Sequence, residues 1–316
     1  MPILWGHLRA LMMAIIVLAA LSLVVVLYVT DRPASNSWRG RSWVSNGTVR
    51  ALSKGAPVPI TIVMMTYRRV EALLANPVFR DIVPLREVDR AILVWNDAAS
   101  DPPPALTQHF QSLGIADKVV IIRPKRNSLN NRYVPYDAIR TSTVFTIDDD
   151  FQVDVTGFRI GLFWAMRHPT RLVGFYPRRL RRDPPTYEFP SRAGDSYNAL
   201  LPGGGLFMPV RFLHAYSSAT YDAQRTFVDD VGNCEDILLQ FVVPPGMHPP
   251  LLIAPTSGRL DSFTRPFTSD EYDRRTGISR APGHPQKRLR CIERFANDLG
   301  WPLVESTAFQ SRSPTH

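Results

Sequence analysis

Apolar and polar positions alternate through the middle of the chain in a pattern typical of an α/β protein. Four short runs rich in β-branched or apolar residues predict strands, at 60–66, 91–95, 118–122 and 143–147. Three segments between them predict short helices, at 69–74, 105–113 and 136–141. Strands that alternate with helices favour a parallel sheet, with ligands gathered at the carboxyl ends of the strands.

An uncharged apolar run from Ala10 to Val29 precedes this region. A helix of about 20 residues spans about 30 Å, which matches one bilayer crossing. A cleaved signal peptide would have a shorter apolar region and a small-residue cleavage site, which the residues after Leu27 do not offer. The pattern therefore predicts a single-pass anchor at 10–29 behind a cytosolic tail at 1–9.

The segment 30–56 is rich in Ser, Arg, Gly and Pro and shows no apolar period, so we expect a flexible stem. Asn46, in Asn-Gly-Thr, is a glycosylation acceptor if the stem is lumenal. The positive charges of Arg32, Arg39 and Arg41, counted alone, would instead place the carboxyl side in the cytosol. We expect one catalytic domain at 57–305 and a carboxyl-terminal tail at 306–316.

Composition adds one constraint. The 316 residues carry 37 Lys and Arg against 28 Asp and Glu, for a net charge of +9, which leaves an anionic partner open without naming it. With 45% hydrophobic residues, the chain is neither collagen-like nor wholly disordered.

Three consecutive carboxylates, Asp148, Asp149 and Asp150, follow the fourth predicted strand. Adjacent like charges repel, and a hard divalent cation bridging to a diphosphate would satisfy both their charge and its preference for oxygen ligands. A solvated acidic turn or a helix cap is the alternative.

Polar residues also follow the other three predicted strands. Thr66 and Arg68 end the first, Asn96 follows the second, and the segment from Asn127 to Arg132 follows the third. Amides and guanidinium groups suit the base, ribose and phosphates of a nucleotide. Singly, each residue is more simply a loop cap, but their shared position at strand ends favours a nucleotide site.

At this point the sequence resembles glycosyltransferase family 64, the exostosin-like N-acetylhexosaminyltransferases with a GT-A fold. The resemblance runs from about Pro59 to Leu303. Its motifs, in chain order, are Thr61 to Arg68, Val94 to Asn96, Asn127 to Arg132, Asp148 to Asp150, Val173 to Arg178, Gly194 to Tyr197, Asn233 to Ile237, Gly283-His284 and Arg288 to Ile292.

The resemblance implies that the Asp motif binds Mn²⁺ and a UDP-sugar. Asp150 would face the metal, and the donor-binding set would be Thr66, Arg68, Asn96, Asn127, Arg132, Asp148 and Asp149. The glycines 203–205 lack the fingerprint of a dinucleotide site, and we interpret them as a close backbone approach near the sugar.

The second half supplies candidate catalytic residues. Glu235 and Asp236 open an apolar helix, where carboxylates are favoured by the dipole whatever their task. In the functional interpretation Asp236 lies beside the anomeric carbon and Glu235 contacts sugar hydroxyls. Arg288, which by composition alone is a solvated helix residue, would by resemblance neutralise the leaving diphosphate. Ser279 and Arg280 replace a tryptophan-histidine pair of some members.

The two cysteines, Cys234 and Cys291, flank these residues. By resemblance they form a disulfide, which would be worth about 4 kcal/mol on the chain-entropy model. Two buried free thiols, natural in a cytosolic protein, are the alternative. A disulfide favours an oxidising lumen, and hence a type II membrane protein of the Golgi or endoplasmic reticulum.

The implied activity is a retaining, manganese-dependent transfer of N-acetylglucosamine or N-acetylgalactosamine from UDP to a glycan or glycolipid, with an α-linkage. Heparan-type primers and inositol-phosphoceramide glycolipids both fit the family as acceptors. A catalytically silent lumenal partner of another glycosyltransferase and a same-fold enzyme for another UDP-hexose are the alternatives. A homodimer is left open, and no nucleic-acid partner is expected.

Overall fold

The computed structural model describes residues 59–310, apart from 192–193, 244–248, 255–262 and 308. The expected cytosolic tail, membrane span and stem, with Asn46, lie outside the described residues. Among the residues that the structure describes, no helix combines the length and apolar character needed to cross a membrane.

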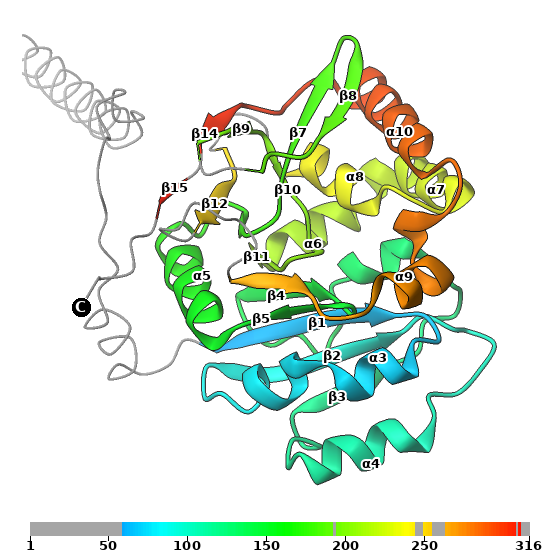
Figure 1. Cartoon of the computed structure of the whole chain (residues 1–316). Coiled ribbons are helices and arrows are strands. Elements are labelled where there is room, and N and C mark those ends of the chain that lie inside the picture. Colours follow the sequence, from blue (N-terminus) through cyan, green and yellow to red (C-terminus); the bar gives the residue numbers. More distant parts are fainter. Residues whose placement is uncertain (1–58, 192–193, 244–248, 255–262, 308, 311–316) are drawn as a thin grey trace, which may run out of the picture. The chain divides into compact units, whose positions relative to one another are not determined.

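The described residues form a mixed α/β fold around a sheet with the strand order β15-β12-β6-β11-β4-β1-β2-β3 (Figure 1). These strands are β1 Ile60–Thr66, β2 Val88–Trp95, β3 Val119–Ile122, β4 Thr143–Asp148, β6 Val173–Gly174, β11 Leu206–Pro209, β12 Leu251–Ala254 and β15 Phe309–Gln310. Strands β4, β1, β2 and β3 run parallel to one another, whereas β11 is antiparallel to both β4 and β6.

Smaller pairings complete the strand inventory. A three-stranded sheet contains β7 Pro177–Arg182, β8 Pro185–Glu188 and β10 Ala199–Leu200. Two further pairs join β5 Phe151–Val153 to β13 Thr264–Pro266, and β9 Ser196–Tyr197 to β14 Ser306–Thr307. Strands β14 and β15 thus lie in the segment that we expected to be a tail.

Helices lie on both faces of the main sheet. They are α3 Val70–Ala75, α4 Pro104–Ser112, α5 Val155–Arg167, α6 Arg211–Tyr216, α7 Asp222–Val231, α8 Glu235–Val242, α9 Asp270–Thr276 and α10 His284–Leu299. Short turns of other helix types are η1 Val78–Ile82, η2 Leu129–Tyr133, η3 Ala219–Tyr221 and η4 Ile278–Arg280.

Strand β1 shows why its apolar run is nearly continuous. Every residue of the strand is buried. Ile62 and Met64 face a core that includes residues of α3, α4 and α5, while Val63 and Met65 face a core that includes residues of α6, α7, α8 and α10. A strand covered on both sides needs apolar residues at successive positions rather than at alternate ones.

The structure confirms the four predicted strands, with small differences at their ends. The helices predicted at 69–74 and 105–113 correspond to α3 and α4. The helix predicted at 136–141 is wrong, because these residues form turns after Pro135. The backbone N–H of Ile139 donates to the carbonyl of Tyr136, three residues earlier, and the Tyr136 hydroxyl donates to the backbone oxygen of Asn131, so the segment is held as a turn. The four predicted strands are parallel to one another, as expected, and β11, which was not among them, enters antiparallel beside β4.

The parallel strands bring the predicted site residues to one edge. Thr66 lies beside Trp95 in the register of β1 and β2, and Met65 lies beside Asp148 in that of β1 and β4.

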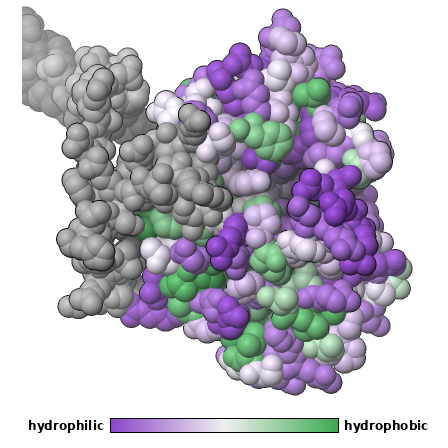
Figure 2. All heavy atoms as spheres, in the orientation of Figure 1, coloured by the Kyte–Doolittle hydropathy of each residue, from purple (hydrophilic) through white to green (hydrophobic). Residues whose placement is uncertain are grey.

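Figure 2 shows hydrophilic side chains in excess over the face it draws, with hydrophobic ones in small groups between them.

Candidate active site

The three aspartates at the end of β4 differ in their surroundings. Asp149 is buried and accepts a 2.6 Å hydrogen bond from Thr66 Oγ1. Its backbone oxygen accepts a further bond, of 3.1 Å, from the side chain of Asn76. Asp149 is therefore built into the protein, whereas Asp148 keeps about a third of its side chain exposed.

Arg69 contacts two carboxylates of the Asp motif, and sequence reasoning missed it. Its Nη1 lies 2.7 Å from Asp149 Oδ1 and 3.1 Å from Asp150 Oδ2. Its Nη2 lies 3.3 Å from Asp273 Oδ1, on α9. Arg69 thus connects the end of β1 to the Asp motif and to a helix more than 200 residues later in the chain.

Arg68, the residue that the sequence indicated, turns elsewhere. It adopts a positive φ of 59° and donates a 2.5 Å hydrogen bond to Asp97. Hydrogen bonds from Arg68 and Ser100 lower the pKa of Asp97 to about 2. The structure therefore does not bring Arg68 to the Asp motif.

The electrostatics of Asp150 suit a cation. Burial, with the neighbouring charges of Asp148 and Asp149, raises the pKa of Asp150 to about 7, despite the opposing charge of Arg69. Asp150 Oδ1 and Asp148 Oδ1 are buried and accept no hydrogen bond from the described residues. These oxygens fit a divalent cation, which prefers carboxylate ligands. In the described part of the chain, no group of three or more His, Cys, Asp or Glu side chains is arranged to hold a metal. Such a cation would take its other ligands from water or substrate.

Arg132 joins the two halves of the site. It lies on η2, and its Nη1 is 2.6 Å from Asp148 Oδ1, an ion pair without the alignment of a hydrogen bond. Its Nε lies 3.6 Å from Glu235 Oε1, at the start of α8. Both nitrogens are buried, and neither makes an aligned hydrogen bond to any of the described residues, although Nη1 is ion-paired with Asp148. Buried donors in this state are exceptional, and a bound anion would satisfy them.

An amide network lies after β2 and β3. The side chain of Asn96 donates to Asn127 Oδ1 at 2.8 Å and to the backbone oxygen of Ser128 at 3.1 Å. Asn131 in turn donates a 2.7 Å hydrogen bond to Asn96 Oδ1. The structure thus brings Asn96 and Asn127 together, as the strand-end argument predicts.

Asp229, on α7, is a second residue that sequence reasoning missed. Its Oδ1 accepts hydrogen bonds from Ser128 Oγ and, at 2.8 Å, from the side chain of Asn130. Asp229 lies about a hundred residues after Ser128 in the chain. Only the folded structure therefore shows that α7 holds the segment of Ser128 and Asn130 in place.

On α8, Glu235 and Asp236 are both buried but differ in charge preference. Burial and the adjacent Asp236 raise the pKa of Glu235 to about 7. Burial also acts to raise the pKa of Asp236, but the charge and hydrogen bonds of Arg288 outweigh it, and the pKa lies below its usual value. Two neighbouring carboxyls with opposite shifts are typical of active sites.

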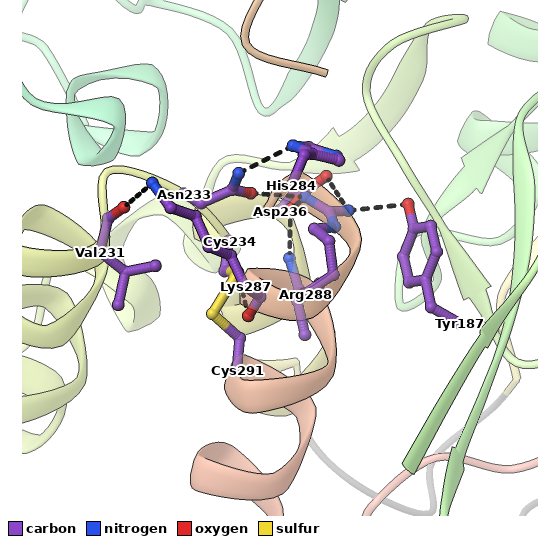
Figure 3. Close-up of a disulfide and its surroundings, with 10 residues drawn as sticks. Tyr187, Val231, Asn233, Cys234, Asp236, His284, Lys287, Arg288 and Cys291 are labelled. Carbon is purple, nitrogen blue, oxygen red and sulfur yellow. Dashed lines mark hydrogen bonds and ion pairs between the residues drawn. A yellow bond between two sulfur atoms is a disulfide. The ribbon is translucent and has the colours of Figure 1, made fainter. Parts of the chain in front are cut away.

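The partner of Asp236 is Arg288, on α10 (Figure 3). Its Nη1 donates to Asp236 Oδ1 at 2.8 Å, and its Nη2 donates to Asp236 Oδ2 at 2.7 Å. Both side chains are almost fully buried. Nearby, Asn233 Nδ2 lies 3.0 Å from His284 Nδ1, and burial with the charge of Arg288 lowers the pKa of His284.

The cysteines hold these two helices together. Cys234 and Cys291 form a disulfide between the residue before α8 and the middle of α10, as Figure 3 shows. This confirms the expected pairing. Cys234 has a positive φ of 80°, so the chain turns sharply before Glu235 and Asp236.

The glycines 203–205 do make a close approach. A Cβ at Gly203 would lie 3.3 Å from Asp148 Oδ2, and one at Gly205 would lie 2.6 Å from the ring of Phe145. The end of β4, which carries the Asp motif, therefore packs directly against the backbone of these glycines.

Comparison with known proteins shows which family the chain belongs to. The model of the glycosyl transferase family 64 domain matches residues 60–313, which covers most of the chain and nearly all of its described part. The chain belongs to glycosyl transferase family 64.

Several curated relatives from plants and animals support this membership. Glucosamine inositolphosphorylceramide transferase 1 of Arabidopsis thaliana is 34% identical over 69% of this chain and 27% of its own length. The exostosin-like-3 homolog of Caenorhabditis elegans is 29% identical over 80% of this chain and 29% of its own length. Exostosin-like 2 of Homo sapiens is 25% identical over 79% of this chain and 75% of its own length. The chain spans about a third or less of the first two relatives.

Among solved structures, GalNAc-T7 with UDP, GalNAc and Mn²⁺ shows a TM-score of 0.42 at 11% identity, over 59% of this chain and 40% of that chain. This likeness is too weak to carry an argument.

Proposed function

We propose that this protein is a glycosyltransferase with a GT-A fold that transfers a sugar from a UDP donor with the help of a divalent cation, Mn²⁺ in the first instance. One observation carries the proposal. Within the described residues, buried oxygens of Asp148 and Asp150 at the end of β4 accept no hydrogen bond, and Arg132, which is ion-paired with Asp148 and lies 3.6 Å from Glu235, has buried nitrogens that donate none. This combination suits a cation and a diphosphate bound together.

The donor that we propose is UDP-N-acetylglucosamine or its galacto epimer, with transfer to a glycan or glycolipid. Family membership supports this choice. The name of the Arabidopsis relative links that protein to an inositolphosphorylceramide acceptor, and the exostosin-type relatives leave a glycan acceptor open.

Each residue of the site has a role in this proposal. Asp150, with Asp148, would hold the cation, which supplies charge stabilisation to a departing diphosphate. Arg132 would bind phosphate oxygens, and the amides of Asn96 and Asn127 would bind the nucleoside. Thr66 and Arg69 would fix Asp149 and, through it, the backbone of the Asp motif.

Asp236 is the carboxylate that we place beside the anomeric carbon. Its lowered pKa keeps it ionised at neutral pH, as stabilisation of an oxocarbenium-like centre requires. Glu235, with a pKa of about 7, would exchange a proton or donate to a sugar hydroxyl near neutral pH. The configuration that we propose for the product is retained, giving an α-linkage.

For location, we propose a type II protein of the Golgi or endoplasmic reticulum membrane with this domain in the lumen. The disulfide between Cys234 and Cys291 supports an oxidising compartment.

Nucleotide release tests the proposed activity. The full chain, purified in detergent, is assayed for UDP release from UDP-N-acetylglucosamine, UDP-N-acetylgalactosamine and UDP-glucose, with Mn²⁺ or with a chelator. We expect manganese-dependent release from one acetamido donor, lost in Asp150→Ala and kept in Asp117→Ala, which removes an exposed carboxylate remote in sequence from the motif. A folded sample that releases UDP from none of the donors would instead indicate a catalytically silent partner of another enzyme.

A further inference from the structure

The hairpin of β7 and β8 packs against α10, and it carries a tyrosine onto the guanidinium of Arg288 (Figures 1 and 3). Arg288 Nη2 donates a 2.8 Å hydrogen bond to the phenolic oxygen of Tyr187. The Cζ of Arg288 also lies 4.6 Å from the centre of the Tyr187 ring. Tyr187 is not among the donor-binding or catalytic residues named above.

The terminal nitrogens of Arg288 have no donor left for a substrate. Each Nη carries two hydrogens. Those of Nη1 are directed to Asp236 Oδ1, at 2.8 Å, and to Asn233 Oδ1, at 3.1 Å. Those of Nη2 are directed to Asp236 Oδ2, at 2.7 Å, and to Tyr187. The hydrogen on Nε, which is buried, has no acceptor among the residues that the structure describes.

Tyr187 is itself held in place from the other side. Arg178 Nε donates a 2.9 Å hydrogen bond to the same phenolic oxygen, and Arg178 Nη1 donates to the backbone oxygen of Pro177 at 2.7 Å. The Arg178 guanidinium lies 4.2 Å from the centre of the Tyr176 ring and 4.3 Å from that of Phe189. The hairpin thus presents a fixed oxygen to α10.

We propose that Tyr187 is a positioning residue, which fixes the guanidinium of Arg288 in the plane of the Asp236 carboxylate and leaves Nε as its one donor for a substrate oxygen. This inference rests on the proposed function, because it takes the oxygen that would contact Arg288 Nε to belong to a substrate of the proposed transferase. A bidentate pair alone lets the guanidinium and carboxylate swing together about their side-chain bonds. The contacts with Tyr187 and Asn233, at opposite corners of the guanidinium, remove that freedom.

A kinetic experiment on the full chain tests this role. Tyr187→Phe keeps the ring and removes the oxygen. A hydrogen bond to a charged group is worth enough to change a rate by about 10- to 100-fold. We expect kcat to fall by about this factor while KM for the UDP-sugar changes by less than about threefold. The reason is that Tyr187 contacts Arg288 and not the UDP-sugar.

The matched control is Tyr197→Phe. The Tyr197 hydroxyl is also fully engaged, donating to the backbone oxygen of Pro250 and accepting from the backbone N–H of Leu252, both at 2.9 Å. This variant should lose stability and keep kcat. Equal losses of kcat in Tyr187→Phe and Tyr197→Phe would show a merely structural effect and overturn the proposal, as would an unchanged kcat in Tyr187→Phe.

A second measurement does not need activity. In [¹⁵N]arginine-labelled protein, the Arg288 side-chain signals are assigned by their loss in Arg288→Lys. We expect separate, slowly rotating Nη signals in the wild type and averaged ones in Tyr187→Phe. Unchanged Nη signals would overturn the positioning role even in an active enzyme. If the wild type turns over no UDP-sugar, but its Nη signals differ from those of Tyr187→Phe as expected, the proposed function is rejected. The anchoring of Arg288 by Tyr187 is then kept.

Discussion

Arg69 Nη1 lies 2.7 Å from Asp149 Oδ1, and the two residues are 80 positions apart in the chain. Both side chains are buried, so the pair is shielded from water. Arg69 also reaches Asp150 and Asp273, and it therefore offsets the repulsion among the carboxylates of the Asp motif. Without this cation, the buried carboxylate of Asp149 between two partly buried aspartates would be costly to fold.

We expect Arg69→Gln to lower the free energy of unfolding by about 3–5 kcal/mol, because breaking a buried ion pair leaves an uncompensated charge. Urea unfolding measures the change. The control is Arg80→Gln, which breaks the exposed pair with Asp81 and should cost less than about 1 kcal/mol. Equal effects of the two substitutions would contradict the role given to Arg69. Saturating Mn²⁺ should recover part of the loss in Arg69→Gln.

The pair of Asp236 and Arg288 should show strong energetic coupling. Asp236→Asn or Arg288→Met alone leaves one buried charge without its partner, and each should lower the free energy of unfolding by about 3–5 kcal/mol. The double variant should lose clearly less than the sum, because neither charge remains. A double-mutant cycle by urea unfolding measures this. Additive losses would mean that the two residues are not paired in solution.

Glu235 should make stability fall as the pH rises. Its pKa is about 7 in the folded protein against about 4.5 when unfolded, so the folded state keeps a proton that the unfolded state releases. Its contribution is present below pH 4.5 and is lost as the pH rises through 7, by about 3 kcal/mol.

The measurement for Glu235 is urea unfolding from pH 4.5 to 8 in the presence of a chelator. Glu235→Gln should lack this loss, so the variant gains on the wild type as the pH rises. Glu71→Gln, which removes an exposed carboxyl, is the charge-matched control. Parallel pH curves for wild type and Glu235→Gln would contradict the prediction.

Part of the site could be predicted because strand ends can be read from sequence. Apolar runs fix where β1, β2 and β4 end, and parallel strands bring those ends together, so Thr66, Asn96 and Asp148 lie at one edge. The two cysteines were paired by family resemblance rather than by any local pattern.

Other parts depend on backbone turns and packing that the sequence does not display. The positive φ of Arg68 directs it to Asp97 and its neighbour Arg69 to Asp149, and two adjacent arginines look alike in a sequence. Asp229 and Tyr187 act through contacts about a hundred residues away, with Ser128 and Arg288. No local pattern distinguishes them from surface residues.

The disulfide should contribute strongly to stability. Cys234 and Cys291 are both fully buried and 57 positions apart, so the bond closes a long loop, worth about 4 kcal/mol in the chain-entropy model. We expect Cys234→Ser with Cys291→Ser to lower the free energy of unfolding by about 2–5 kcal/mol. Reductant should destabilise the wild type similarly and leave the double variant unchanged. A reductant effect in the double variant would rule out this explanation.

Gly205 should be far less tolerant of a methyl group than Gly114. Both have a positive φ, of 102° and 67°, so alanine is strained at either position. At Gly114 no described residue lies within 4 Å of the added Cβ, and the cost should be about 1–2 kcal/mol. At Gly205 the Cβ would lie 2.6 Å from the ring of Phe145, which is fully buried on β4 and packs against Phe207 at 4.4 Å between ring centres.

Because that ring is fully buried and packed against other rings, Gly205→Ala should cost about 1–3 kcal/mol more than Gly114→Ala in urea unfolding. Strand β4 ends at Asp148, so displacing Phe145 should also weaken binding of UDP in the presence of Mn²⁺, which calorimetry can measure. Gly114→Ala should leave that binding unchanged. Equal costs for the two glycines would mean that β4 yields to the methyl group, and the Asp motif would then have a softer support than its packing indicates.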